Sequence, residues 1–361
     1  MCLLELEKLK LHAESVGDLK EFADCCNSLG ALYAENGEYE EALDEHRAEL
    51  TAAEACGNQV AVALAHRRIG ECLMNMGEFE NAELNVSDYL ALSQSLDDEY
   101  NTQLAYHVLG LVHLKWAELI GDGEPFDSNR TSHLMQSHEF FRKSYVMCKA
   151  AKDQRGIKDR TSAVLLNLGM VKSLLKNYGD SFDALKEAMK LAVESSNSDL
   201  LQRCYYELSV VCYQRHDLAA AEAYCRELLT IAVKRHSKEE QVDAYLNLFH
   251  VYIEQENIKK ALDIIQRAKR LKCTSHVEWS QVISYKKSAK KMQQSIEQLK
   301  EIAAANEPVN RMKLFEKIAD LLAESLSTNC MKHLELALKY YEKMVIHQFV
   351  IHSFTLSLIA S

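Results

Sequence analysis

A set of polar side chains recurs at corresponding positions along this chain and could together hold a peptide. The asparagines each offer an amide donor and a carbonyl acceptor, so they can bind the backbone of an extended peptide whatever its sequence. The carboxylates favour a ligand that carries lysine or arginine, because such contacts are charge-assisted hydrogen bonds. The candidate binding residues are Asn27, Glu35, Arg67, Glu71, Asn75, Asn167, Tyr206, Glu207, Asp243, Asn247, His250 and Glu254.

Catalytic or metal-binding chemistry has no comparable pattern in the sequence. The 14 histidines include no His-Glu-x-x-His motif. The pairs His133/His138 and His347/His352 are each five residues apart, which places the two members on different faces of a helix. Glycine-rich phosphate loops, Gly-x-Ser-x-Gly and Cys-x-x-Cys do not occur. We therefore predict no enzymatic activity, no metal and no cofactor. Three further histidines lie near packing positions and are expected to be structural: His66, His113 and His250.

The candidate residues are placed by a repeat of 40 residues. Successive units carry a small residue, or its replacement, at Gly30, Gly70, Gly110, Gly169, Ser209 and Phe249. These positions are 40 residues apart except for one interval of 59, which contains the turn-rich segment 121–130. A second small residue follows each time, for example Ala42 and Ala82. This pattern is typical of helix–turn–helix units of the tetratricopeptide kind, in which small residues let the two helices approach closely.

The turns between units have their own signature. Thirteen residues before the first small position of each unit stand Gly17, Gly57, Asp97, Gly156, Ser196 and His236. A residue with positive φ at this point would close the preceding helix. Glycine suits that conformation best, so the three other residues are poorer substitutes for it.

We predict an all-α fold, a tetratricopeptide-repeat (TPR) right-handed superhelical solenoid with repeats of about 40 residues. Residues 1–272 are expected to form an array of about six helix pairs, with an insertion near 118–136. A spacer or capping helix is expected over 273–307, a further TPR-like pair over 308–345, and an uncharged C-terminal tail over 346–361. In such a solenoid the first helix of each unit lines a concave face, the usual binding surface, and the candidate residues were chosen for that face.

Composition narrows the function classes further. The 361 residues include only 12 glycines and 2 prolines, too few turn residues for a sandwich or barrel of short strands. A net charge of −11 argues against direct nucleic-acid binding and fits a basic protein partner. The 11 cysteines without a disulfide-type framework indicate a reducing compartment. The amphipathic first residues are not a signal peptide, and the last 16 are too polar to favour a membrane anchor.

Several segments resemble one known family, the Tonsoku-like proteins. The similarity is closest in 41–46 (EALDEH), 65–71 (AHRRIGE) and 89–92 (YLAL). It continues through the lengthened third unit to Arg160-Thr161 and Leu166–Gly169, and into the helical pattern after Cys273. The resemblance covers roughly residues 20–345. Ser209 and Phe249, which replace the small glycine, depart from the repeat pattern.

The resemblance implies a non-enzymatic scaffold and histone reader in the nucleus, at chromatin and stalled replication forks, acting in double-strand break repair by homologous recombination. The TPR part of the family is associated with the histone H3 tail, so the implied partner is H3, within H3–H4. The Mms-twenty-two-like repair partner is expected for the full-length family. The ankyrin and leucine-rich repeats that carry much of the family's partner binding are not found here, so we expect a truncated or partial chain.

An alternative function remains open: a cytoplasmic TPR adaptor of the Pins or kinesin-light-chain type, a class that also uses repeats near 40 residues. Peptides bound by such adaptors tend to differ in charge from a histone tail. The charge of the bound peptide and the location of the protein, nuclear or cytoplasmic, would therefore separate the two functions. Neither function requires direct contact with nucleic acid or a membrane.

Overall fold

The computed structural model describes residues 3–121, 128–151, 156–255 and 257–271, together with residues 282, 283, 285–287, 290, 293 and 294. These residues are helical apart from short turns and include no strand, which confirms the predicted all-α class. The helices up to residue 271 are α1 (Leu3–Val16), α2 (Leu19–Glu35), α3 (Tyr39–Ala55), α4 (Gln59–Met76), α5 (Phe79–Ser95), α6 (Glu99–Ile120), α7 (Ser128–Ala150), α8 (Ile157–Leu174), α9 (Tyr178–Glu194), α10 (Ser198–Gln214), α11 (Leu218–Lys234), α12 (Lys238–Glu254) and α13 (Ile258–Arg270).

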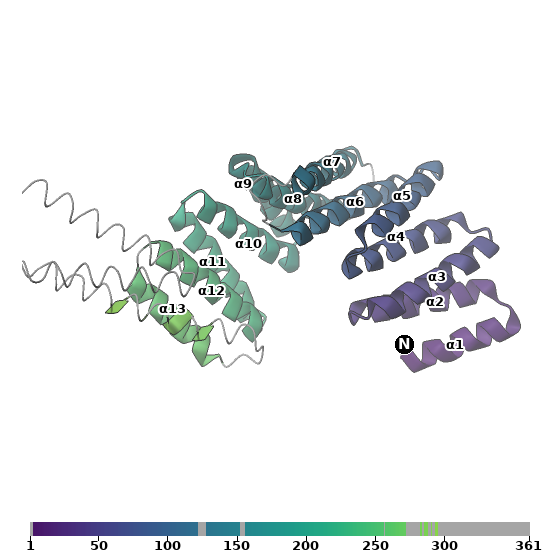
Figure 1. The fold of residues 1–361 in the computed structure, drawn as a ribbon, viewed down its shortest axis with the longest axis horizontal. Coiled ribbons are helices and arrows are strands. Elements are labelled where there is room, and N and C mark those ends of the chain that lie inside the picture. Colours follow the sequence, from purple (N-terminus) through teal and green to yellow (C-terminus); the bar gives the residue numbers. More distant parts are fainter. Residues whose placement is uncertain are drawn as a thin grey trace, which may run out of the picture. The chain divides into compact units, whose positions relative to one another are not determined.

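The helices pair as the 40-residue spacing predicts. Helix α2 packs on α3, α4 on α5, α6 on α7, α8 on α9, and α12 on α13. The first helices α4, α6, α8 and α10 also pack on the second helix of the preceding pair. Figure 1 shows this succession from the purple α1 to the teal α10. The tetratricopeptide fold is therefore confirmed.

The turns between units adopt the predicted left-handed backbone. The φ angles are 74° at Gly17, 66° at Gly57, 52° at Asp97, 62° at Gly156, 57° at Ser196 and 56° at His236. Side chains other than glycine rarely occupy this region, so the three substitutes keep a conformation that costs free energy. The geometry of the turn is thus retained where the glycine is lost.

The residue after this turn caps the helix that follows. Asp18 accepts a hydrogen bond from the backbone N–H of Glu21 at 3.0 Å, and Asp98 accepts one from Asn101 at 2.9 Å. The same cap is made by Asn58, Asn197 and Ser237. Each such cap satisfies an otherwise unpaired N–H of the first turn and contributes about 1 kcal/mol. The caps explain where α2, α4, α6, α10 and α12 begin, whereas α8 begins after Gly156 without a side-chain cap.

Small residues set the distance between the helices of a pair. A Cβ on Gly70 would lie 2.4 Å from Val86 Cγ2, and one on Gly110 would lie 2.6 Å from Phe141 Cε1. Val86 and Phe141 are themselves 0% exposed. Because protein interiors are close-packed, these glycines have no room for a side chain without a shift of the neighbouring helix. The predicted role of the small positions is confirmed here.

The third pair is longer than its neighbours. Helix α6 has 22 residues and α7 has 23, whereas α2, α3 and α5 each have 17. Polar contacts join the two long helices: Gln103 Nε2 donates to Ser144 Oγ at 2.7 Å, and Ser137 Oγ donates to the carbonyl of Gly110 at 2.7 Å. Much of the extra length of this repeat therefore lies in α6 and α7, on either side of residues 122–127.

On a larger scale than the single repeats, the chain divides into two compact parts, with the boundary inside α11. We call residues 1–224 the first unit and residues 225–361 the second unit. The predicted pair over 308–345 and the tail over 346–361 lie outside the described residues, as does most of the predicted spacer helix over 273–307. Among the helices that the structure describes, none is both long enough and apolar enough to cross a membrane.

Candidate peptide-binding surface

All twelve candidate residues lie on the first helix of a helix pair. Asn27 and Glu35 are on α2, Arg67, Glu71 and Asn75 on α4, Asn167 on α8, Tyr206 and Glu207 on α10, and the remaining four on α12. First helices of successive pairs also touch directly, α4 with α6 and α8 with α10. Residues at equivalent repeat positions are therefore brought near one another along this side of the first unit.

The residues on α4 form a polar cluster that extends to α6. Arg67 Nη1 donates to Glu71 Oε1 at 3.1 Å, and Asn75 Nδ2 donates to the carbonyl of Glu71 at 2.9 Å. Lys115 Nζ donates to Asn75 Oδ1 at 2.6 Å. Lys115 and Asn75 occupy equivalent positions 40 residues apart. Both groups of the Asn75 amide are thus engaged within the chain, so this side chain must exchange partners before it can hold a peptide.

A second cluster joins α6, α8 and α10. Asn167, which is 3% exposed, donates from Nδ2 to His107 Nε2 at 3.3 Å. Burial lowers the pKa of His107 to about 4, and the nearby charge of Arg203 acts in the same direction. His107 is therefore neutral at pH 7 and serves as the acceptor at Nε2. This pairing leaves Asn167 Oδ1 buried and without a hydrogen-bond partner in the part of the chain that the structure describes.

Glu207 is the most perturbed carboxylate of the candidate set. Burial raises its pKa to about 7, against the attraction of Arg203 one turn earlier on α10, while the charge of Glu118 on α6 raises it further. A carboxylate that keeps such a pKa lacks the partner that would hold it ionised. The neighbouring Tyr206 is exposed. Helix α10 therefore carries an exposed tyrosine and, as the next residue, a carboxyl group whose pKa is raised by burial.

The other candidate residues are not joined to these clusters by a described contact. Asn27 is half-buried on α2, and Glu35 is exposed at the end of that helix. Four candidates belong to the second unit: Asp243, Asn247, His250 and Glu254. Within that unit, the ring of His250 meets Tyr285 edge-on, with centroids 5.1 Å apart.

Sequence reasoning missed a buried charged network between the first two pairs. His46 Nδ1 and Glu49 Oε2 are 2.9 Å apart, and Arg68 Nη1 donates to Glu49 Oε1 at 2.9 Å. Glu49 is 4% exposed and His46 is 1% exposed. His46 also packs on Gly30, where an added Cβ would meet the imidazole ring at 2.6 Å. Two of the segments that carry the family resemblance, 41–46 and 65–71, are thus linked through Glu49.

Histidines outside the candidate set are packed as expected. His66 Nδ1 lies 3.1 Å from Asn85 Oδ1. His113 Nδ1 lies 3.1 Å from His133 Nδ1, and the His133 ring stacks on Trp116 with centroids 4.0 Å apart. Burial lowers the pKa of His113 to about 4 and also lowers that of His133. Within the described residues, no three His, Cys, Asp or Glu side chains are grouped so as to bind a metal ion.

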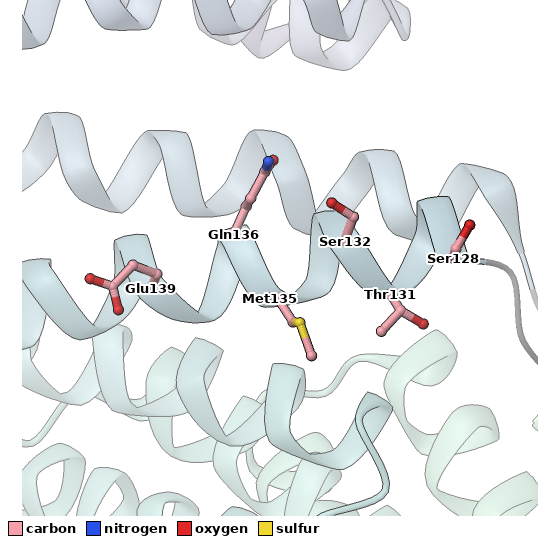
Figure 2. Close-up of a pocket in the computed structure, with 6 residues that line it drawn as sticks. All are labelled: Ser128, Thr131, Ser132, Met135, Gln136 and Glu139. Atoms are coloured by element: carbon pink, nitrogen blue, oxygen red, sulfur yellow. The ribbon is translucent and has the colours of Figure 1, made fainter.

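An open hollow on the first unit lies along α7 and contains none of the candidate residues. Figure 2 shows that its lining side chains all come from this one helix: Ser128, Thr131, Ser132, Met135, Gln136 and Glu139. Glu139 is engaged with Arg142 through two contacts of 2.9 Å. The described lining residues thus form one face of the lengthened helix, and among them no polar group comes from a second element.

Comparison with known proteins agrees with this architecture. Two tetratricopeptide-repeat family models match residues 160–234 and 22–48. Both matches support the tetratricopeptide fold described above. The chain is also similar to a solved signal-transduction ATPase with a tetratricopeptide-repeat sensor from Pyrococcus horikoshii, with a TM-score of 0.63 and 14% identity over 88% of this chain and 45% of that one. That likeness concerns the fold alone.

The resemblance to Tonsoku-like proteins extends along most of this tetratricopeptide-repeat chain. The Tonsoku-like protein of Drosophila melanogaster is 24% identical over 345 residues, which cover 94% of this chain and 24% of that protein. The Tonsoku-like protein of Mus musculus is 26% identical over 330 residues, which cover 90% and 23%. The predicted resemblance is confirmed, and the chain spans about a quarter of the length of these relatives.

Proposed function

We propose that this tetratricopeptide-repeat protein is a nuclear scaffold that binds a basic peptide on its first helices. The histone H3 tail is the proposed peptide, and replication-coupled repair of DNA by homologous recombination is the proposed setting. The protein acts by holding its partner and carries out no reaction itself. Similarity to the Tonsoku-like proteins over some nine-tenths of the chain supports the setting.

The observation that carries the proposal is the character of the first helices in the first unit. These helices carry Asn27, Glu35, Glu71 and Glu207, and two successive pairs of first helices, α4 with α6 and α8 with α10, touch. Burial raises the pKa of Glu207, and the attraction of Arg203 offsets this rise only in part. A cationic peptide supplies a further positive charge, and the net charge of −11 draws such a peptide toward the protein.

Titration of the purified chain with a fluorescent, unmodified histone H3 tail peptide tests the proposal. Two control peptides have the same length: one with every lysine and arginine changed to glutamate, and one with the same composition in scrambled order. We expect the basic peptide to bind and the acidic one not to bind. Affinity should fall as salt is raised, because the attraction is partly between exposed charges.

The same panel separates the scaffold from the cytoplasmic adaptor. Preference for the acidic peptide, together with exclusion of a tagged chain from the nucleus, would overturn the proposal and favour the adaptor. Equal binding of the H3 tail and its scrambled version would reduce the function to non-specific charge attraction. No binding of any of the three peptides would remove the peptide-binding function from this chain.

A further inference from the structure

The carboxylate of Glu207 accepts no hydrogen bond from the residues that the structure describes. The charges that act on it are Arg203, from its own helix, and Glu118, from α6, and none of the described contacts is a hydrogen bond to its oxygens. Removing an ionised carboxylate from water costs free energy unless a cation and hydrogen-bond donors replace the lost hydration. The site is therefore incomplete as an ion pair.

A second unsatisfied acceptor lies on the adjacent first helix. Asn167 Oδ1 is buried and has no hydrogen-bond partner among the described residues, although Asn167 Nδ2 is engaged by His107. Asn167 and Glu207 are 40 residues apart and occupy the same position in successive units, on helices α8 and α10 that touch. Arg203 acts electrostatically on both His107 and Glu207, which connects the two neighbourhoods.

The balance of donors and acceptors at this place identifies the missing group. Asn167 Oδ1 and the Glu207 carboxylate are acceptors, and neutral His107 already uses Nε2 as an acceptor toward Asn167. Glu118 adds a further negative charge, and Arg203 offsets only one of the two carboxylates. An anion would be repelled and a neutral apolar group would leave both acceptors unpaired. A primary ammonium offers three donors, and a guanidinium offers five.

We propose that Glu207 and Asn167 form a socket for one cationic side chain, lysine or arginine, of the peptide bound to the first helices. This inference rests on the proposed function and specifies the part of the surface that selects a basic residue. Glu207 supplies the charge and Asn167 the second acceptor.

The first test removes the charge of Glu207 while keeping its shape. Binding of the H3 tail peptide is measured for the intact chain, for Glu207→Gln and for Asp183→Asn. Asp183 is exposed on the second helix α9, so its variant changes the net charge equally and leaves the socket intact. We expect Glu207→Gln to weaken binding about tenfold or more and Asp183→Asn to change it less than twofold, since a charge-assisted bond is worth about one to two decades of affinity.

Peptide variants identify the residue that enters the socket. Single lysines are replaced by norleucine and single arginines by citrulline, which remove the charge and keep the length. One replacement should weaken binding to the intact chain about tenfold, and that replacement should have no further effect on Glu207→Gln. Whether it is a lysine or an arginine decides between the two cations. If every replacement weakened binding to Glu207→Gln as much as it weakened binding to the intact chain, the socket would be wrong.

The pH dependence of binding provides a readout that a merely structural role would not move, because a cation that binds ionised Glu207 releases its proton. Glu207 in the free chain has a pKa of about 7, and a bound cation holds it ionised, so affinity should rise about tenfold from pH 6 to pH 8. The groups that act on Glu207 are Arg203 and Glu118, and the adjacent His107, with a pKa near 4, does not titrate in this range. Glu207→Gln should show a flat profile with a histidine-free, N-acetylated peptide.

The possible results separate the socket from the proposed function. If the intact chain binds no basic peptide, the proposed function fails and the socket fails with it. If the intact chain binds but Glu207→Gln binds equally well with the same pH profile, the socket alone is wrong. Glu207→Asp keeps the charge and should retain pH-dependent binding, so a loss in Glu207→Gln with retention in Glu207→Asp would exclude simple misfolding as the cause.

Discussion

Replacement of Gly70 by leucine tests the helix contact on which the whole repeat depends. A Cβ at this position would lie 2.4 Å from Val86 Cγ2 and 3.3 Å from the carbonyl oxygen of Ala82. Carbon atoms in contact need about 3.5 Å or more, so α4 and α5 would have to separate by about 1 Å for the first added atom alone. Val86 cannot turn aside, because a β-branched side chain in a helix has one strongly preferred rotamer.

The expected magnitude follows from two opposing terms. Exchange of glycine for alanine inside a helix gains about 1 kcal/mol of helix propensity. Overpacking of a filled core costs about 1–3 kcal/mol. Gly70→Ala should therefore be close to neutral or destabilised by about 2 kcal/mol, and Gly70→Leu, which adds three more carbons, should lose about 3 kcal/mol. Gly179→Ala is the matched control, since Gly179 is helical and has nothing within 4 Å of the added Cβ.

The assay is urea denaturation followed by far-ultraviolet circular dichroism, with hydrogen exchange to locate the loss. Gly70→Leu should shift the first unfolding transition to lower urea by about 1–2 M, given the usual dependence on denaturant. Faster exchange should be concentrated in α3–α6, because repeat stability is set by nearest neighbours. Gly179→Ala should be unchanged or slightly stabilised. A Gly70→Leu chain that unfolds at the urea concentration of the unaltered protein would refute the contact and the repeat register.

Three further predictions concern charged and titrating groups. Arg68→Met leaves the carboxylate of Glu49, which is 4% exposed, without its donor and should cost about 3–5 kcal/mol in urea denaturation, with much of the loss recovered by adding Glu49→Met. Glu207 has a pKa raised from 4.5 to about 7, so its ionisation opposes folding. As pH rises from 5 to 8, the free energy of unfolding of the intact chain should fall by up to about 3 kcal/mol relative to Glu207→Gln. Equal pH dependence of the two proteins in thermal melts would contradict this. His113 has a pKa lowered from 6.5 to about 4, so stability should fall by about 2 kcal/mol between pH 7 and pH 5 as the unfolded chain takes up the proton, and His113→Phe should weaken that fall in the same melts.

Much of the fold could be predicted because the repeat depends on local features of the sequence: small residues, left-handed turns and helix caps. Gly70 and Ala82 mark a close helix contact by their size alone, and the glycine at position 57 marks a left-handed turn. The caps at Asp18 and Asn58 are visible in the same spacing, directly after the turn residue, and a search for N-cap residues at 40-residue intervals would have found them.

The site was less predictable, because side-chain pairing depends on rotamers and on distant contacts. Periodicity places Asn75 on a first helix but does not show that Lys115 occupies its amide oxygen. His113 on α6 lies close to His133 on α7 because the third helix pair is longer than the others. The added residues have no counterpart in the other repeats, so the 40-residue spacing does not predict this contact. Nothing in the sequence distinguishes Glu49 from a surface carboxylate, and only the fold shows that Arg68 reaches it across 19 residues.

Contacts that run almost entirely between consecutive helices also bear on how the protein is made. Helix α2 meets α3 and α4 meets α5, and among the described helices nearly all contacts join elements that follow one another in the chain. A nascent chain could therefore complete its first helix pair while the later ones are still being translated on the ribosome, because short-range contacts close quickly and at low entropic cost. Each new pair would dock on a finished neighbour. The order of synthesis and the order of assembly would then coincide, which keeps apolar helix faces exposed for only one repeat at a time.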